Sequence, residues 1–307
     1  MAWTDSSAHR VRLVAVAPGV RLEVLDWGGS GPPLVFLAGL QDVAHGFDDF
    51  APRFRDHFRV LAMTRRGYGA SSQTPAGYDL TTRVADLRTV LDSLGLTRVA
   101  LAGHSIAGDE LTAFAGRFPE RVTALVYLDA AYDHSGIGAL IRESPAPPPM
   151  LRSDSASPTA VQAYLLRAYG MPIPEAQLRA IARYDTAGKL VADVTPGTID
   201  SQMIAGSGHP QYEAVRVPAL AIYAVVDSAP QVFPSWGRLD STGRVVARHF
   251  TSVLQAWAAA ERARFRRELP TGEVVELHGA NHYVFASNAA EVTQAMRSFL
   301  ARAGGRP

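Results

Sequence analysis

The stretch VALAGHSIAGDEL, residues 99–111, decides the fold of this chain. Its first residues are small or branched and apolar, which is typical of a strand buried on both faces. A helical pattern begins directly after Gly103-His104-Ser105. A sharp bend from strand to helix requires small residues on both sides of the serine, and Gly103, Ala107 and Gly108 satisfy this. The pattern predicts a serine hydroxyl raised above the end of a strand for chemistry, rather than an ordinary tight turn.

Runs of the same apolar type recur along the chain. They cover residues 34–37, 58–64, 98–103, 124–129, 219–227 and 273–279, and two alternating runs, 11–17 and 20–27, flank the turn dipeptide Pro18-Gly19. Helical patterns lie between them, one opening near Asp79 and one near the C-terminus with Asn288 and Glu291 as a capping pair. This alternation predicts an α/β fold with a mostly parallel central sheet, helices on both faces and an antiparallel edge from the opening hairpin.

Two intervals interrupt this alternation. Residues 131–216 show no convincing strand, but a proline-rich connector at 144–150 precedes helical stretches at 158–169, 174–184 and 196–205. We interpret this interval as a helical cap, or lid, inserted after the sixth strand, so that residues 1–130 and 217–307 form the core domain and 131–216 the cap. The second interval, 228–271, carries a long helix, and core packing explains its apolar stripe of Phe250, Leu254, Trp257, Phe265 and Leu269.

Composition excludes several classes of protein. The 307 residues include 30 basic and 29 acidic side chains, a net charge of +1 that predicts no nucleic-acid partner. The absence of cysteine excludes disulfides, cysteine-ligated zinc and a thiol nucleophile. No apolar run reaches the roughly 18 residues that a membrane-spanning helix needs, so no integral membrane contact is expected. The start of the sequence lacks a secretory signal, which predicts a cytoplasmic protein and leaves open a secreted or periplasmic one whose signal was removed.

A nucleophilic serine needs a histidine base. Among nine histidines, His282 is the best placed, because it follows the last predicted strand in LHGANHYVF. His278 precedes it by four residues, but the pair lies in a loop and lacks the glutamate of the helical zinc motif, so no metal site is predicted. His104 is adjacent to Ser105, and neighbours on a bend point apart. We therefore expect His104 to pack beside the substrate pocket rather than act as the base.

Two aspartates could orient the histidine. Asp227 ends the strand 219–227 and gives the chain order serine, acid, histidine that is expected for this architecture. Asp129 ends the strand 124–129, and either strand end could reach His282. We favour Asp227 as the acid and keep Asp129 as the alternative acid, otherwise a structural residue that caps the entry to the cap region.

These segments resemble the α/β-hydrolase superfamily over essentially the whole chain. The resemblance rests on LVFLAGLQD (34–42), TRRGYGASS (64–72), GHSIAG (103–108), ALVYLD (124–129), PALAIYAVVD (218–227) and GANHYVF (279–285). Within the superfamily the chain looks like the capped, lipase- and esterase-like serine hydrolases, because the epoxide hydrolase and dehalogenase branches place aspartate where Ser105 stands. The resemblance implies an oxyanion hole formed by the backbone N–H groups of Ile106 and Leu40. No cofactor is predicted, because the sequence contains no phosphate loop, no dinucleotide-binding glycine fingerprint and no metal cluster.

The chain departs from the family pattern around the oxyanion loop. The loop begins Ala38-Gly39 rather than His-Gly, and Gln41-Asp42 replaces a proline-containing continuation. These two polar residues either line the acyl pocket or cap the following helix. Apolar and aromatic residues of the cap either line the substrate pocket or pack the cap on the sheet; they are Met150, Tyr164, Tyr169, Met203 and Tyr212.

We therefore predict a serine hydrolase that cleaves small-molecule carboxylic esters with an apolar acyl or alcohol part through an acyl-enzyme. One alternative keeps the three catalytic groups and changes the reaction to C–C bond, thioester or lactone cleavage, or to a lyase step. Another is a non-catalytic small-molecule receptor on the same fold. The sequence does not indicate an oligomeric state.

Overall fold

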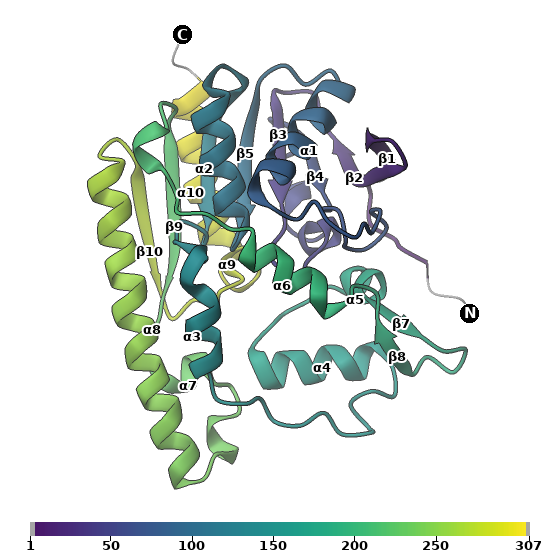
Figure 1. The fold of residues 1–307 in the computed structure, drawn as a ribbon, viewed down its shortest axis with the longest axis vertical. Helices are drawn as coiled ribbons and strands as arrows, with labels where there is room; N and C mark the ends of the chain where they lie inside the picture. The colour runs from purple at the N-terminus through teal and green to yellow at the C-terminus, as the bar shows by residue number, and fades with distance from the viewer. Residues whose placement is uncertain (1–3, 305–307) are drawn as a thin grey trace.

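An eight-stranded sheet forms the centre of the computed structural model, which describes residues 4–304 (Figure 1). The strand order is β1-β2-β4-β3-β5-β6-β9-β10. The strands are β1 (Arg10–Ala17), β2 (Val20–Gly28), β3 (Pro33–Leu37), β4 (Arg59–Met63), β5 (Val99–His104), β6 (Val122–Leu128), β9 (Ala219–Val225) and β10 (Glu273–His278). The first two pair antiparallel at one edge and β2 pairs antiparallel with β4, whereas the other pairings are parallel. The predicted mostly parallel sheet with an antiparallel edge is confirmed.

Helices cover both faces of the sheet. One apolar cluster packs the sheet against α1 (Leu80–Ser93), α2 (Ala107–Arg117) and α8 (Ser241–Glu268). A second cluster packs the other face against α9 (Val284–Ser287), α10 (Ala289–Gly304) and the short 3-10 helices η1 (Ala44–Phe47) and η2 (Ala51–Phe54). Every residue of β5 is buried, because this central strand has helices on both sides.

The helix starts follow the capping signals in the sequence. The side chain of Asp79 accepts a hydrogen bond from the backbone N–H of Thr82 at 2.9 Å, which caps the first turn of α1. Asn288 directly precedes α10, and its side chain lies 2.5 Å from the carboxylate of Glu291. Both predicted helix openings are therefore confirmed.

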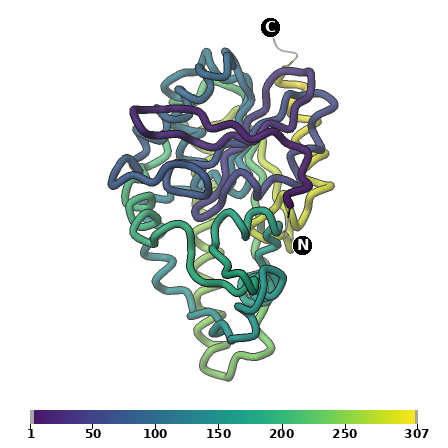
Figure 2. Tube along the Cα trace, turned by 90° about the vertical axis from the view of Figure 1, so that its right-hand side faces the viewer, coloured from purple at the N-terminus to yellow at the C-terminus, as the bar shows by residue number. Residues whose placement is uncertain are grey.

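The segment between β6 and β9, here called the insertion, lies along one end of the sheet (Figures 1 and 2). It contains η4 (His134–Gly136), α3 (Ile137–Glu143), α4 (Pro158–Tyr169), α5 (Glu175–Ile181), α6 (Gly197–Ala205) and η5 (Tyr212–Ala214). The helical stretches predicted in it correspond to α4, α5 and α6, while α3 was not predicted. The division of the chain into a core and a cap domain remains a prediction, and its outermost residues, 1–3 and 305–307, lie outside the described residues.

The expectation that the insertion contains no strand is wrong. The strands β7 (Ala182–Tyr184) and β8 (Leu190–Asp193) pair antiparallel within it. Between them, Asp185 and Lys189 bond through their backbones, and Gly188 adopts a positive φ of 84° that closes the turn. Strands of three and four residues on an exposed surface carry too little apolar alternation to be recognised in the sequence.

The second interval contains α7 (Ala229–Val232), η6 (Trp236–Arg238) and the 28-residue helix α8. The predicted long helix is therefore present, and it runs beside α3 at the edge of the insertion (Figure 1). Among the described helices, none combines the length and the apolar character needed to cross a membrane.

The start of α2 packs very closely on the end of β6. A Cβ atom on Gly108 would lie 1.8 Å from the backbone oxygen of Ala130. Real Cβ atoms do not approach a backbone oxygen this closely, so any side chain at this position must displace one of the two backbones. This contact holds the helix that follows Ser105 against the strand end that carries Asp129.

We expect Gly108→Ala to lower the free energy of unfolding by about 1–3 kcal/mol, because the added methyl group overpacks a rigid contact. The control is Gly197→Ala, which also changes a glycine in the first turn of a helix but finds no atom within 4 Å. The free energy of unfolding of that variant should be unchanged or higher by up to about 1 kcal/mol. Urea unfolding of the three proteins tests this, and equal stabilities would show that the contact is not tight.

Candidate active site

Ser105 lies on a strained bend between β5 and α2. Its φ is +54°, a left-handed conformation that costs a non-glycine residue about 1–2 kcal/mol. Its N–H extends the ladder to the carbonyl of Leu128 at 3.3 Å. A Cβ on Gly103 would lie 2.1 Å from the side chain of Leu111 and 2.8 Å from that of Ala107. The small residues around the serine are therefore required by the bend itself.

Two backbone N–H groups near the serine are available to an anionic oxygen. Ile106 directly precedes α2, and Leu40 lies in the loop that follows β3. Neither N–H has a hydrogen-bond partner among residues 4–304, and both residues line the same cavity as Ser105. Unpaired donors beside a helix N-terminus suit a developing negative charge.

A buried arginine fixes the loop that carries Leu40. The guanidinium of Arg65 donates to the carbonyl of Gly39 at 3.0 Å and forms a two-pronged ion pair with Glu110 of α2 at 2.7 Å on each prong. Both side chains are almost fully buried. Charge-assisted bonds of this geometry are strong and directional, so Arg65 ties the loop after β3 to the helix after Ser105.

His282 pairs with Asp129 in the structure. Nδ1 of His282 lies 2.6 Å from Oδ2 of Asp129, and the other carboxylate oxygen accepts hydrogen bonds from Tyr132 at 2.6 Å and from the N–H of Ala224 at 3.0 Å. Asp129 is buried, whereas His282 is partly open to the cavity. Burial of the imidazole opposes its charged form, but the hydrogen bond to Asp129 and its charge, together with the charge of Asp42, raise the pKa of His282.

The structure does not bring Asp227 to His282, which corrects our assignment of the acid. Asp227 lies two residues beyond the end of β9, is half exposed and pairs with His278 at 2.8 Å. Asp129 directly follows β6 in a left-handed conformation, with a φ of +47°, and is buried beside the imidazole. Asp227 lies on the more exposed side of the strand ends, where it meets the exposed His278. The residue that we treated as the alternative acid therefore occupies the position beside the imidazole.

His104 contacts His282 without replacing it. Its ring lies 4.6 Å from the ring of His282, and its Nε2 lies 3.1 Å from the backbone oxygen of His282. A carbonyl oxygen only accepts, so Nε2 carries the proton. Burial, followed by the charge of His282, lowers the pKa of His104 and keeps the ring neutral. His104 thus packs against the histidine loop and also borders the cavity.

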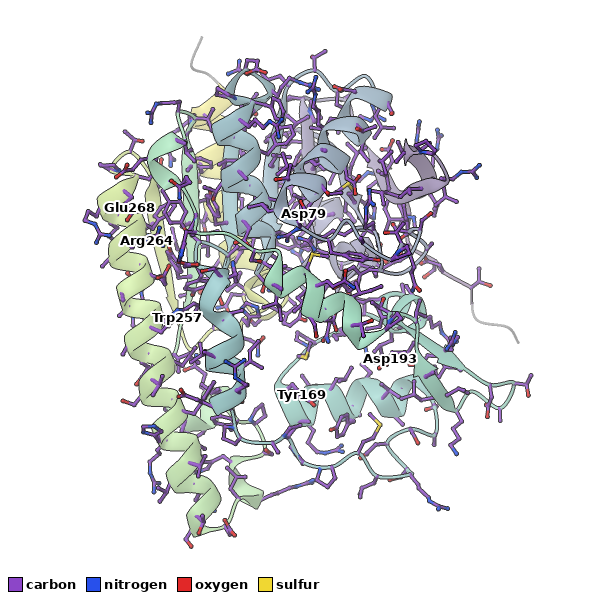
Figure 3. The ribbon with its side chains drawn as sticks, in the orientation of Figure 1. Asp79, Tyr169, Asp193, Trp257, Arg264 and Glu268 are labelled. Carbon is purple, nitrogen blue, oxygen red and sulfur yellow. The ribbon has the colours of Figure 1, made fainter. Side chains whose placement is uncertain are left out.

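A cavity of about 480 Å³ opens in front of these groups. Its polar part contains Ser105, His104, Asp129 and His282. Its walls are largely apolar and come mainly from α3, α6, α7 and α8; they include Ile137, Leu140, Ile141, Ile204, Val232, Phe250, Leu254 and Trp257. Figure 3 labels Trp257 on α8 and Tyr169 at the end of α4, on either side of α3, and both line the cavity. Among the described lining residues there is no lysine or arginine.

Several pocket predictions need correction. Phe250, Leu254 and Trp257 line the cavity, so core packing does not account for the whole apolar stripe of α8, although Phe265 does lie in the core. Of the predicted pocket residues, Tyr169, His104 and Asp42 line the cavity. The others lie elsewhere. The amide of Gln41 bonds to Asp200, and the hydroxyl of Tyr164 bonds to the backbone of Pro148. Met203 and Tyr212 lie in the core, and Met150 is exposed. Spacing along a helix does not reveal which apolar side chains face a void.

Asp42, the neighbour of Gln41, is buried beside the site. Its Oδ1 accepts hydrogen bonds from Gln177 of α5 at 2.5 Å and from Tyr283 at 3.2 Å. Asp42 therefore joins the insertion to the loop that carries His282. It also lines the cavity, which agrees with the first of our two interpretations of this residue.

A family model described as the alpha/beta hydrolase fold matches residues 32–184, and the solved structures that match share this fold. The chain belongs to the α/β-hydrolase superfamily. Among solved structures, this α/β hydrolase matches E-2-(acetamidomethylene)succinate hydrolase with a TM-score of 0.71 and 21% identity, covering 95% of this chain and 99% of the other.

The sequence relatives of this α/β hydrolase include a hydrolase and a peroxidase. The 2-(acetamidomethylene)succinate hydrolase of Mesorhizobium japonicum is 23% identical over 278 residues, or 89% of each chain. The non-heme chloroperoxidase of Streptomyces lividans is 32% identical over 145 residues, or 46% of this chain and 47% of the relative. The match therefore spans less than half the length of the peroxidase relative.

We expect Asp129→Asn to lower the pKa of His282, because the amide removes the charge and the strong acceptor that favour the imidazolium. The control, Asp227→Asn, removes the carboxylate beside His278 and should leave the pKa of His282 unchanged. NMR titration of the His282 ring in the three proteins measures this. If the pKa of His282 fell in the Asp227 variant and stayed at the wild-type value in the Asp129 variant, Asp227 would be the acid.

Proposed function

We propose that this α/β hydrolase is a serine hydrolase that cleaves uncharged carboxylic esters with apolar acyl or alcohol parts. The observation that carries the proposal is the Asp129–His282 pair, which opens on the same cavity as Ser105 and the unpaired N–H groups of Leu40 and Ile106. These are the base, the orienting acid, the nucleophile and the oxyanion donors that acyl transfer requires.

Each group has a defined role in the proposed reaction. His282 accepts the proton of Ser105 as Oγ attacks the ester carbonyl, and the resulting oxyanion is bound by the N–H groups of Ile106 and Leu40. Collapse of this intermediate breaks the ester bond, and His282 gives its proton to the departing alkoxide. Water then attacks the acyl-serine with His282 again as base, which releases the acid and restores Ser105. Asp129 holds Nδ1 protonated and stabilises the imidazolium throughout.

The cavity supports an apolar, uncharged substrate. Its walls are mainly aliphatic and aromatic, and the described lining contains no cationic side chain. A doubly negative substrate would need such a cation to offset its desolvation. The succinate derivative named for the Mesorhizobium relative is a dicarboxylic acid, so we do not extend that substrate to this chain. Thioesters and lactones fit the same groups, but the cavity gives no reason to prefer them.

We expect Ser105→Ala to lower kcat for p-nitrophenyl esters by a factor of about a thousand to a million, because the nucleophile is lost. In the wild type, kcat/KM should rise from acetate to longer acyl chains as more apolar surface is buried. The control is Ser252→Ala, which removes an exposed hydroxyl on α8 and should leave kcat at the wild-type value.

A fluorophosphonate probe provides a second measurement on the same three proteins. The wild type and the Ser252 variant should be labelled, and the Ser105 variant should not. Absence of labelling in the wild type, or unchanged ester hydrolysis after Ser105→Ala, would contradict the proposal and favour a non-catalytic receptor.

We expect kcat/KM to fall on acidification with an inflection above pH 6.5, the ordinary pKa of histidine. His282 must be neutral to accept the serine proton, and Asp129 favours its cation, so the inactive protonated form persists to a higher pH than for a free histidine. The inflection should coincide with the pKa of His282 measured by NMR. A profile that stays flat well below pH 6.5 would exclude His282 as the base.

A further inference from the structure

Two histidines and two aspartates meet where the N-terminal segment passes η1, outside the active-site cavity. Nε2 of His9 lies 3.2 Å from Asp5 and 3.3 Å from Asp48. Nδ1 of His45 lies 2.9 Å from Asp48 and 3.6 Å from Asp5. One ligand atom from each side chain lies within 4.8 Å of all the others, and none of the four residues lines the active-site cavity.

The nitrogen–oxygen spacings are close to the edge length of a metal coordination tetrahedron, with His9 facing Oδ1 of Asp48 and His45 facing Oδ2. Zinc binds histidine nitrogen and carboxylate oxygen at about 2.0–2.2 Å, which places neighbouring ligand atoms about 3.3–3.5 Å apart. The four nitrogen–oxygen distances range from 2.9 to 3.6 Å, so each pair already lies close to the separation that a shared ion requires. Little movement of the side chains is needed to bind one.

The buried polar atoms of this cluster lack other partners. The side chains of His9 and Asp48 are each only 4% exposed. Both ring nitrogens of His9 and Oδ1 of Asp48 make no hydrogen bond, although they lie close to one another. A buried polar atom without a partner costs about 1–3 kcal/mol, so a purely hydrogen-bonded cluster leaves this part of the molecule unsatisfied. An ion in the cluster would satisfy Nε2 of His9 and Oδ1 of Asp48.

The surroundings suit a divalent cation. Two carboxylates supply two negative charges, and neutral imidazoles supply the remaining ligands. The free nitrogen of His45, Nε2, faces Glu23 at 4.0 Å, which places a carboxylate behind a histidine ligand. Such outer carboxylates orient metal-bound histidines and increase their basicity. Glu23 is itself held by Thr64, whose hydroxyl donates to it at 2.6 Å.

We propose that Asp5, His9, His45 and Asp48 bind one divalent transition-metal ion, with zinc as the ion whose preferred ligands and geometry fit best. Our sequence-based prediction of no metal considered only His278 and His282. The cluster consists of two local pairs, Asp5 with His9 and His45 with Asp48, and nothing in the sequence shows that the two pairs meet. The site would fasten the N-terminal segment to η1. It is independent of the proposed ester hydrolysis.

The bound ion would stabilise the fold rather than take part in the proposed reaction. The helix η1 follows the loop that contains Leu40, and the N–H of its first residue, Ala44, donates to Thr64 at 2.9 Å. Since Thr64 also donates to Glu23, which faces His45 at 4.0 Å, the start of η1 is connected to the carboxylate behind the cluster. A bound ion stabilises the folded state in proportion to its free concentration, so zinc should raise the melting temperature.

The test uses the full-length, tag-free chain, first treated with a chelator and then dialysed against limiting zinc. We expect about one zinc per chain in the wild type by elemental analysis, and almost none after His9→Ala or Asp48→Asn, which each remove one ligand. The control is His57→Ala, which removes the exposed histidine beside Asp56 and should bind zinc like the wild type. Zinc should raise the melting temperature of the wild type and control only.

Circular dichroism of the metal-free proteins shows whether each variant folds. If a variant does not fold, the wild type alone decides the matter through cobalt(II), whose visible spectrum distinguishes a four-coordinate site from the hydrated six-coordinate ion. Failure of the wild type to retain zinc, equal retention by folded His9 and Asp48 variants, or a six-coordinate cobalt spectrum would each overturn the proposal. None of these measurements depends on ester hydrolysis.

Discussion

The bend at Ser105 is the constraint on which the rest of the site depends. Its left-handed backbone leaves no room for a side chain at Gly103 and presses Gly108 against the backbone of Ala130. The same bend places the N–H of Ile106 at the start of α2. The ion pair between Arg65 and Glu110 then connects that helix to the oxyanion loop. The bend thereby sets the nucleophile and the Ile106 donor, and the ion pair ties the loop of the Leu40 donor to them.

Strain is concentrated around the same cavity. Among the described residues, three non-glycine residues have a positive φ: Gln41, Ser105 and Asp129. Each follows a parallel strand, in the loop after β3, at the end of β5 and at the end of β6. Left-handed residues of this kind cost about 1–3 kcal/mol each and persist only where the surrounding structure holds them. Here the close packing of neighbouring strand ends does so, and the strained turns bring backbone and side-chain groups to one point.

The two parts of the cavity have different origins. The sheet and its turns supply the polar groups, whereas the insertion and α8 supply most of the apolar walls. Asp42 links the two parts, because it bonds to Gln177 of the insertion and to Tyr283 beside the histidine. A change in the insertion can therefore alter the shape of the pocket while leaving the serine, the histidine and their donors in place, which is how one fold serves many substrates.

The sequence by itself determined the eight strands, the main helices, the bend and the histidine that follows the last strand. These features depend on local rules: apolar periodicity, capping residues and the small side chains that a sharp turn requires. The acid, the pocket walls and the cluster of Asp5, His9, His45 and Asp48 depended on the tertiary structure. Asp129 and Asp227 both follow apolar strands, and only the tertiary structure shows that Asp129 lies beside His282 while Asp227 pairs with His278, because the backbone after each strand sets where its carboxylate lies. Likewise, residues that face a cavity and residues that face the core follow the same helical spacing, since both surfaces are apolar.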